Sequence, residues 1–134
     1  MRFLTTILAA LLIVSSAFAA PPAVEKAAKD STVLVKCKRG RMMAYGSAAY
    51  IGDSLFVTNF HVIERAESVT VNIPGTAVRY DCRVIATNVK ADVAILISKN
   101  PVKRIKAVEF AVVTPRLSPV YAAGYGSSLQ DKIP

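Results

Sequence analysis

The sequence predicts an all-β protein in which six antiparallel strands close into a small barrel. From residue 31 onward, brief runs of β-branched and other apolar residues follow one another between turn residues, and no long stretch has helical periodicity. The chain has 134 residues, enough for one compact domain with a core but short of the roughly 200 that two barrels need. We therefore expect one domain and the beginning of a second.

The expected strands are bounded by short turns rich in glycine, proline, asparagine and aspartate, which favour chain reversal. The turns are expected at 39–40, 52–53, 74–75 and 99–101, and the strands at 32–39, 41–51, 54–59, 68–73, 78–88 and 93–98. Residues 61–66 are too few for more than a turn of helix. They are expected to form a loop at a strand end, where functional residues often lie.

Residues 1–19 have the three parts of an export signal: a basic start, an apolar run and small residues ending at Ala19. Cleavage after Ala19 would leave a polar N-terminal segment at 20–30 and a secreted or periplasmic protein. A membrane anchor is the competing interpretation. The run contains serines and threonines and barely reaches the roughly 20 apolar residues that a span needs, so no stable membrane insertion is expected after cleavage.

The chain is basic, with 17 Lys and Arg against 9 Asp and Glu. This favours contact with anionic surfaces or acidic partners. No nucleic-acid partner is expected, because no exposed aromatics are interleaved with the basic residues for base stacking. Two basic clusters surround expected turns: Lys36, Lys38, Arg39 and Arg41, and Lys99, Lys103, Arg104 and Lys106. A non-catalytic single-barrel module that binds an anionic partner in the envelope therefore stays open as a function.

The two cysteines, Cys37 and Cys82, both fall on the apolar side of an alternating strand pattern, so both are expected in the core. An exported protein could join them in a disulfide. Alternatively they are two small buried residues that never meet, because a disulfide needs Cα atoms within about 7 Å. Neither is expected to be a nucleophile.

The only histidine, His61, is followed about a hairpin and a strand later by Asp92, which heads an apolar run. A histidine that acts as general base for a hydroxyl nucleophile needs a buried carboxylate to hold its ring. The structural alternatives are a packed histidine and a solvated turn aspartate. A single histidine also argues against a metal enzyme, and no cofactor is expected.

Three segments support the catalytic interpretation by their order and spacing: Gly-Ser-Ala-Ala-Tyr-Ile at 46–51, Val-Thr-Asn-Phe-His-Val at 57–62 and Asp-Val-Ala-Ile-Leu at 92–96. Together they resemble the first barrel of the trypsin-like serine peptidases, particularly the bacterial exported type related to the high-temperature-requirement proteases. Residues 119–125 are similar to the first strand of that family's second barrel. Ala48 and Phe60 depart from the family pattern as tolerable packing changes.

The resemblance implies a chymotrypsin-like barrel at 31–100 that carries His61 as general base and Asp92 as its orienting acid. Residues 101–134 would be a linker and the first strand of an incomplete second barrel. The implied function is an exported serine endopeptidase acting on a protein or peptide substrate.

The family's nucleophile is a serine in a Gly-x-Ser-Gly turn whose N–H groups also form the oxyanion hole. The 134 residues contain no such turn. Ser127 and Ser128 follow a glycine, but they lie too close to Asp92 in sequence for a second barrel to intervene, so they are not expected to substitute. We therefore expect this chain to be a fragment that is inactive by itself, and a cysteine nucleophile stays open.

Overall fold

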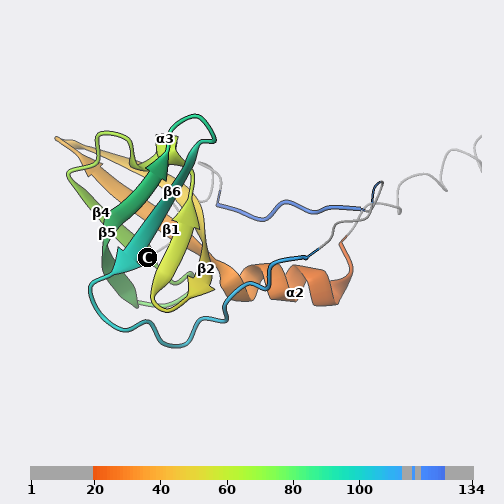
Figure 1. Ribbon diagram of the computed structural model, residues 1–134. Coiled ribbons are helices and arrows are strands. Elements are labelled where there is room, and N and C mark those ends of the chain that lie inside the picture. Colours follow the sequence, from red (N-terminus) through yellow and green to blue (C-terminus); the bar gives the residue numbers. More distant parts are fainter. Residues whose placement is uncertain (1–19, 113–115, 117–118, 126–134) are drawn as a thin grey trace, which may run out of the picture.

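The computed structural model describes residues 20–112, 116 and 119–125. Six antiparallel strands close into a barrel in the order β1-β2-β3-β6-β5-β4 (Figure 1). The strands are β1 (Thr32–Arg39), β2 (Met42–Gly52), β3 (Leu55–Thr58), β4 (Ser68–Asn72), β5 (Arg79–Asn88) and β6 (Val93–Ser98). The barrel closes where β4 pairs with β1, with Val71 opposite Val35. The predicted six-stranded barrel is confirmed, and each strand lies within one residue of its expected bounds.

The core fills the barrel interior with the inward-facing residues of every strand. On β1, Val33, Val35 and Cys37 are exposed by 1% or less, as the alternation of apolar and basic residues predicts. Phe56 of β3 is completely buried and packs against Tyr50 of β2, with their ring centroids 5.2 Å apart. The tightly packed interior gives the strand ends fixed positions.

The outer half of β5 lies beyond this core and is paired only with β6. Its pairing with β4 stops at Cys82, whereas its pairing with β6 continues to Asn88. Val84, which the sequence pattern places inward, is consequently 39% exposed. The hairpin that results carries its turn to the end of the barrel where the short helix α3 (Phe60–Ile63) lies (Figure 1).

A helix that the sequence analysis did not expect precedes the barrel. Helix α2 (Pro22–Ser31) occupies most of the polar segment at 20–30. It starts with proline, which is pre-organised for the first turn, and ion pairs join Glu25 to Lys29 and Lys26 to Asp30 at i,i+4 spacing. Ser31 is the one buried residue of this helix, so α2 lies outside the barrel core. No helix among the described residues is both long enough and apolar enough to cross a membrane.

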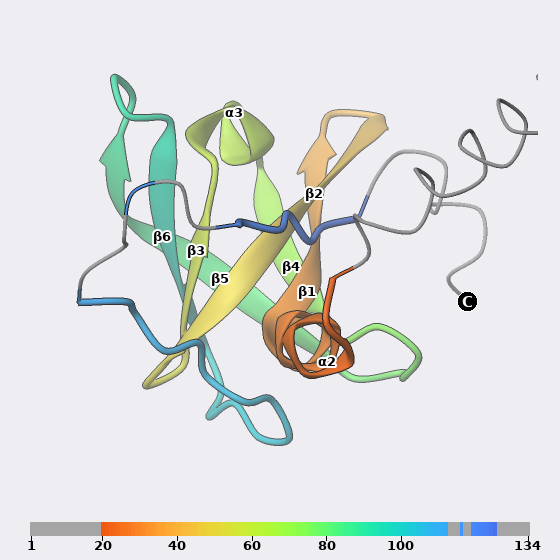
Figure 2. The same cartoon turned by 90° about the vertical axis from the view of Figure 1, so that its right-hand side faces the viewer.

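The described residues after β6, 99–112, 116 and 119–125, run over the outside of the barrel without regular structure. The Val108 N–H donates to the Tyr50 carbonyl at 2.9 Å. Residues 119–125 then pass across β2, above the end of α2 (Figure 2), and the Tyr125 N–H donates to Ser47 Oγ at 2.6 Å. Residues 119–125 form no strand among the described residues. The strand expected there is therefore not formed; residues 126–134 lie outside the described part of the chain, and the second barrel stays a prediction.

Candidate active site

His61 lies just past the end of β3, where the chain leaves the barrel. The burial of β3 alternates, with Phe56 and Thr58 inward. Asn59 continues the extended backbone, and a single turn of helix, α3, begins at Phe60. This turn lifts the His61 side chain to the surface, where it is 68% exposed. The predicted loop with one turn of helix is confirmed.

Asp92 lies in the tight turn between β5 and β6. Its N–H donates to the Val89 carbonyl at 3.2 Å, and the Ala91 N–H donates to Asn88 Oδ1 at 3.0 Å. Asp92 itself has φ +53°, in the left-handed region that aspartate tolerates better than most residues. This conformation ends the turn immediately before β6.

The pairing of β3 with β6 brings the two predicted residues together. Thr58 lies opposite Ala94 in this antiparallel pair, so residues after Thr58 and before Ala94 lie at the same end of the barrel. His61 Nδ1 is 2.7 Å from Asp92 Oδ2, and the His61 backbone N–H donates to Asp92 Oδ1 at 2.9 Å. The sequence-predicted pair is thus in direct contact through both carboxylate oxygens.

The electrostatics of the pair favour an ionised aspartate. The pKa of Asp92 is lowered, first by the hydrogen bond from the His61 backbone N–H and next by the bond from its ring, while partial desolvation opposes both. An ionised carboxylate can only accept hydrogen bonds. Nδ1 is therefore the protonated ring nitrogen when His61 is neutral, and Nε2 carries the lone pair. Nε2 has no hydrogen-bond partner in the described part of the chain.

The carboxylate is less buried than a triad aspartate is expected to be. The Asp92 side chain is 43% exposed, although the sequence analysis looked for a buried group. The reason is that the β5–β6 turn lies beyond the barrel core, and the described residues leave its outer side uncovered. In this state the carboxylate can orient the ring and stabilise its protonated form, but the pair lies open to water.

Two further residues fix the backbone of α3. A Cβ added at Gly46 of β2 would lie 2.6 Å from both methyl carbons of Val62, so the helical turn sits directly on the bare backbone of that glycine. At the other end of the turn, Arg39 Nη2 donates to the carbonyls of His61 at 2.8 Å and Val62 at 3.0 Å. A cation at these carbonyls satisfies groups that a helix end leaves without partners.

From the sequence, Arg39 was assigned to a basic surface cluster, and no contact with the turn that carries His61 was predicted. The structure places the Arg39 guanidinium on α3. Asn59 is a second residue whose contact was missed: its Nδ2 donates to the Asp92 carbonyl at 3.0 Å. Only its place beside His61 in the motif could have drawn attention to it.

The disulfide considered for Cys37 and Cys82 is not formed, and both residues are free thiols in the core. In the sheet, Cys37 pairs with Val69 of β4, and Val69 pairs on its other side with Cys82. Two strand spacings separate the cysteines, about 10 Å, which exceeds the reach of a disulfide. Burial raises the pKa of the Cys82 thiol to about 11 and also raises that of Cys37, so neither is a ready nucleophile.

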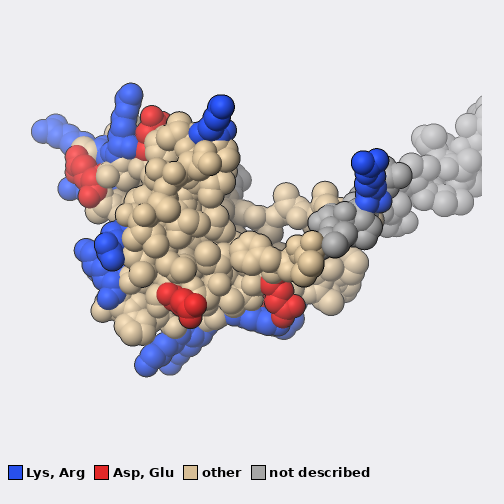
Figure 3. Space-filling model, in the orientation of Figure 1, with Lys and Arg blue, Asp and Glu red and all other residues tan. Residues whose placement is uncertain are grey.

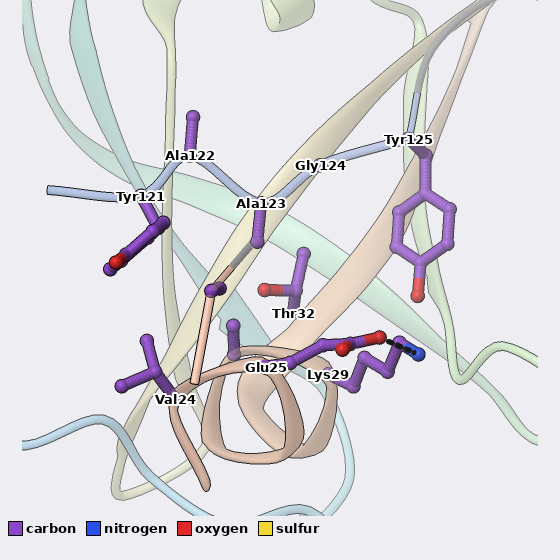
Figure 4. A pocket seen from close by; sticks show the side chains of 11 residues that line it. Val24, Glu25, Lys29, Thr32, Tyr121, Ala122, Ala123, Gly124 and Tyr125 are labelled. Atoms are coloured by element: carbon purple, nitrogen blue, oxygen red, sulfur yellow. Dashed lines mark hydrogen bonds and ion pairs between the residues drawn. The ribbon is translucent and has the colours of Figure 1, made fainter. Parts of the chain in front are cut away.

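Ser127 and Ser128 lie outside the described residues. Within those residues, no group of three or more His, Cys, Asp and Glu side chains could hold a metal ion. A pocket of about 380 Å³ lies between α2 and residues 121–125 (Figure 4). Its lining is mostly apolar, with the Glu25 and Lys29 ion pair at its floor, and it contains neither His61 nor Asp92.

The model of the trypsin-like peptidase domain matches residues 46–133. The chain belongs to the trypsin-like peptidase family. Since the match spans both His61 and Asp92, the family predicted from the three motifs is confirmed.

Solved structures with the same fold include two forms of one protease. The active form of the Rv3671c protease from M. tuberculosis is 19% identical, with a TM-score of 0.59 over 78% of this chain and 51% of that one. The inactive form of a serine-to-alanine mutant of Rv3671c from M. tuberculosis H37Rv is 22% identical, with a TM-score of 0.59 over 77% of this chain and 51% of that one. At this identity the likeness shows the chymotrypsin-like fold. The chain spans about half the length of these structures, and comparison with curated proteins gave no match.

Proposed function

We propose that this chain supplies the general base and orienting acid of an exported serine endopeptidase. The observation that carries the proposal is the contact of His61 Nδ1 with Asp92 Oδ2 at 2.7 Å, made by a member of the trypsin-like peptidase family. The contact directs the Nε2 lone pair outward, and no residue of the described part occupies it. This is the arrangement a hydroxyl nucleophile requires of its base.

In the proposed reaction, Nε2 of His61 takes the proton of a serine hydroxyl as its oxygen attacks a peptide carbonyl. Asp92 stabilises the imidazolium that forms. The imidazolium then gives its proton to the leaving amine, and an acyl-enzyme remains. A water molecule repeats the sequence and releases the acid. We propose that the serine and the oxyanion hole come from a second barrel, since the chain spans half the length of the solved proteases.

The test is an activity measurement on the product of the natural gene, after the codons that follow codon 134 have been read for a Gly-x-Ser-Gly or Gly-x-Cys-Gly turn. Hydrolysis of an unfolded protein substrate and labelling by a fluorophosphonate are both expected with the serine form. Asp92→Asn is expected to lower kcat about 10⁴-fold, and His61→Ala is expected to lower it by at least as much.

Asp81→Asn is the matched control, because it removes an exposed carboxylate of β5 that makes no ion pair in the described part. It should leave hydrolysis unchanged. Hydrolysis that survives His61→Ala would contradict the assignment of the base.

Export is part of the same proposal and rests on the signal pattern at residues 1–19. The expected product outside the cytoplasm begins at Ala20, immediately before α2. Mass spectrometry of the N-terminal peptide measures this directly. A protein recovered only with residues 1–19 attached would show that the segment is retained.

The alternative, a module that binds an anionic partner, has less support. Lys and Arg side chains are spread over several sides of the barrel and do not gather in one patch in the view of Figure 3. Arg39 is also turned onto α3. The face seen in Figure 3 therefore offers no single basic patch for contact with an anionic surface.

A further inference from the structure

Asn59 stands at the N-cap of α3 but does not cap it. Asparagine at this position normally accepts a hydrogen bond from one of the first free N–H groups of the helix. Here the Asn59 side chain makes no capping bond. The His61 N–H, which such a cap would satisfy, instead donates to Asp92 Oδ1 at 2.9 Å.

The Asn59 side chain instead forms a hydrogen bond with the turn of the β5–β6 hairpin. Its Nδ2 donates to the Asp92 backbone carbonyl at 3.0 Å. Three hydrogen bonds therefore connect residues 59–61 to Asp92: one to its carbonyl and one to each of its carboxylate oxygens. Because they hold both the backbone and the side chain of Asp92, they fix the rotation of the carboxylate relative to the imidazole.

The backbone conformation of Asp92 explains why these three hydrogen bonds are needed. Its φ of +53° is a left-handed conformation that is unfavourable for residues other than glycine, although aspartate tolerates it better than most. Strain of this kind persists only when surrounding contacts over-determine it. The turn also lies beyond the barrel core, so packing contributes little to holding it, and the Asp92 side chain is 43% exposed.

We infer that Asn59 is a positioning residue: its amide holds the Asp92 backbone so that the carboxylate accepts from both the backbone N–H and the ring of His61. The inference rests on the proposed function, because the orientation of the ring matters only if His61 acts as a base. Asn59 also adds a small contribution to the lowered pKa of Asp92.

The test uses His61, the one histidine among these 134 residues, as its own spectroscopic probe. In the unaltered protein, ¹⁵N NMR at neutral pH should show His61 with its proton on Nδ1, and ¹³C NMR should show a lowered pKa for Asp92. Asn59→Ala should shift the ring toward the Nε2–H form and raise the pKa of Asp92 toward its ordinary value.

Asn59→Ser separates positioning from capping. Serine is as good an N-cap as asparagine, but it is too short to repeat the amide bond to the Asp92 carbonyl. The inference requires Asn59→Ser to behave like Asn59→Ala. If serine restores the Nδ1–H tautomer and the lowered pKa, capping explains the residue and the inference is overturned.

Asn100→Ala is the matched control, an exposed asparagine after β6 that should leave both signals unchanged. If Asn59→Ala does not fold, exchange of the Asn59 side-chain amide protons in the unaltered protein decides. Protection indicates the bond to Asp92, and exchange at the rate of a free amide contradicts it.

Activity in the complete protein separates this inference from the proposed function. Asn59→Ala should lower kcat about 10²-fold, as misplacement of a catalytic group does, with KM unchanged. If the NMR signals change as expected but no hydrolysis depends on His61, the proposed function fails and the positioning role of Asn59 stands. If hydrolysis depends on His61 but Asn59→Ala leaves it intact, the proposed function stands and the positioning role of Asn59 fails.

Discussion

At the scale of single residues, the site depends on a carboxylate that accepts hydrogen bonds from two parts of one histidine. Asp92 receives the His61 backbone N–H and its ring N–H on different oxygens. Charge-assisted bonds of this kind are stronger than neutral ones. Because protonation of Asp92 removes the charge that strengthens both bonds, the geometry of the pair depends on pH.

The first prediction concerns that dependence. The pKa of Asp92 is lowered in the folded protein, so the unfolded chain binds its proton more tightly. Its stabilisation is present above the ordinary aspartate pKa of about 3.9 and is lost as the pH falls through the lower, folded value. The free energy of unfolding should be measured in urea at about pH 7 and at acidic pH for wild type and for Asp92→Asn. On acidification, the variant should lose less of this free energy than the wild type does. An equal loss in both proteins would contradict the shift.

The second prediction concerns the cysteines, which should stay reduced and unreactive in the folded protein. With the pKa of Cys82 raised to about 11, its thiolate fraction near pH 8 falls about two orders of magnitude below that of a free cysteine. Alkylation by iodoacetamide, followed by mass spectrometry, should therefore be at least that much slower than in urea. Incubation with oxidised glutathione should not lower the mass of the protein by the two hydrogens that a disulfide removes. Formation of an intramolecular disulfide would contradict the separation of the cysteines by two strand spacings.

At the scale of elements, the helical turn that carries His61 depends on how closely it approaches β2. Gly46 has ordinary backbone angles, so its role is one of space: a methyl group there would meet Val62 at 2.6 Å. At that distance one of the two elements must shift. The barrel strands are locked in their ladder, so we expect α3 to move.

The third prediction follows. Gly46→Ala should destabilise the protein by about 1–3 kcal/mol, as overpacking does, and should perturb the NMR signals of His61. In the double variant Gly46→Ala with Val62→Ala, the removed methyl groups should relieve the contact. Its loss of stability, measured by urea unfolding, should then be smaller than the sum of the two single losses. Additive losses would indicate that the two residues do not compete for space.

At the scale of the whole molecule, the described contact between the barrel and residues 119–125 is a local one. The Tyr125 N–H reaches Ser47 Oγ at 2.6 Å. Gly124 lies so close that a Cβ there would be 3.0 Å from the same oxygen. Ser47 faces outward from β2, between the inward residues Gly46 and Ala48, so it can hold this segment without disturbing the core.

The fourth prediction tests this attachment. Ser47→Ala should remove one hydrogen bond worth about 1 kcal/mol, which corresponds to about fivefold faster hydrogen exchange at the Tyr125 amide. The melting temperature should change little, because the segment lies outside the barrel core. Ser68→Ala, at the exposed start of β4, is the control. Unchanged exchange at Tyr125 in Ser47→Ala would show that other contacts hold the segment.

The sequence by itself determined the strands, their inward faces and the identity of the His61 and Asp92 pair. These features have local signatures: alternation with a period of two, turn residues between runs, and motif order along the chain. Helix α2 also has local signals, a proline in its first turn and two i,i+4 ion pairs, but they were not used to predict it. The same local pattern correctly placed both cysteines inside the barrel.

Only the tertiary structure decided which residues meet. Strand register separates Cys37 and Cys82 by Val69, turns Arg39 onto α3 and places Asn59 against the Asp92 carbonyl. It also leaves Asp92 half exposed, because the β5–β6 turn extends past the core. Each of these contacts joins residues far apart in sequence, and their spacing along the chain does not encode the register across strands that brings them together.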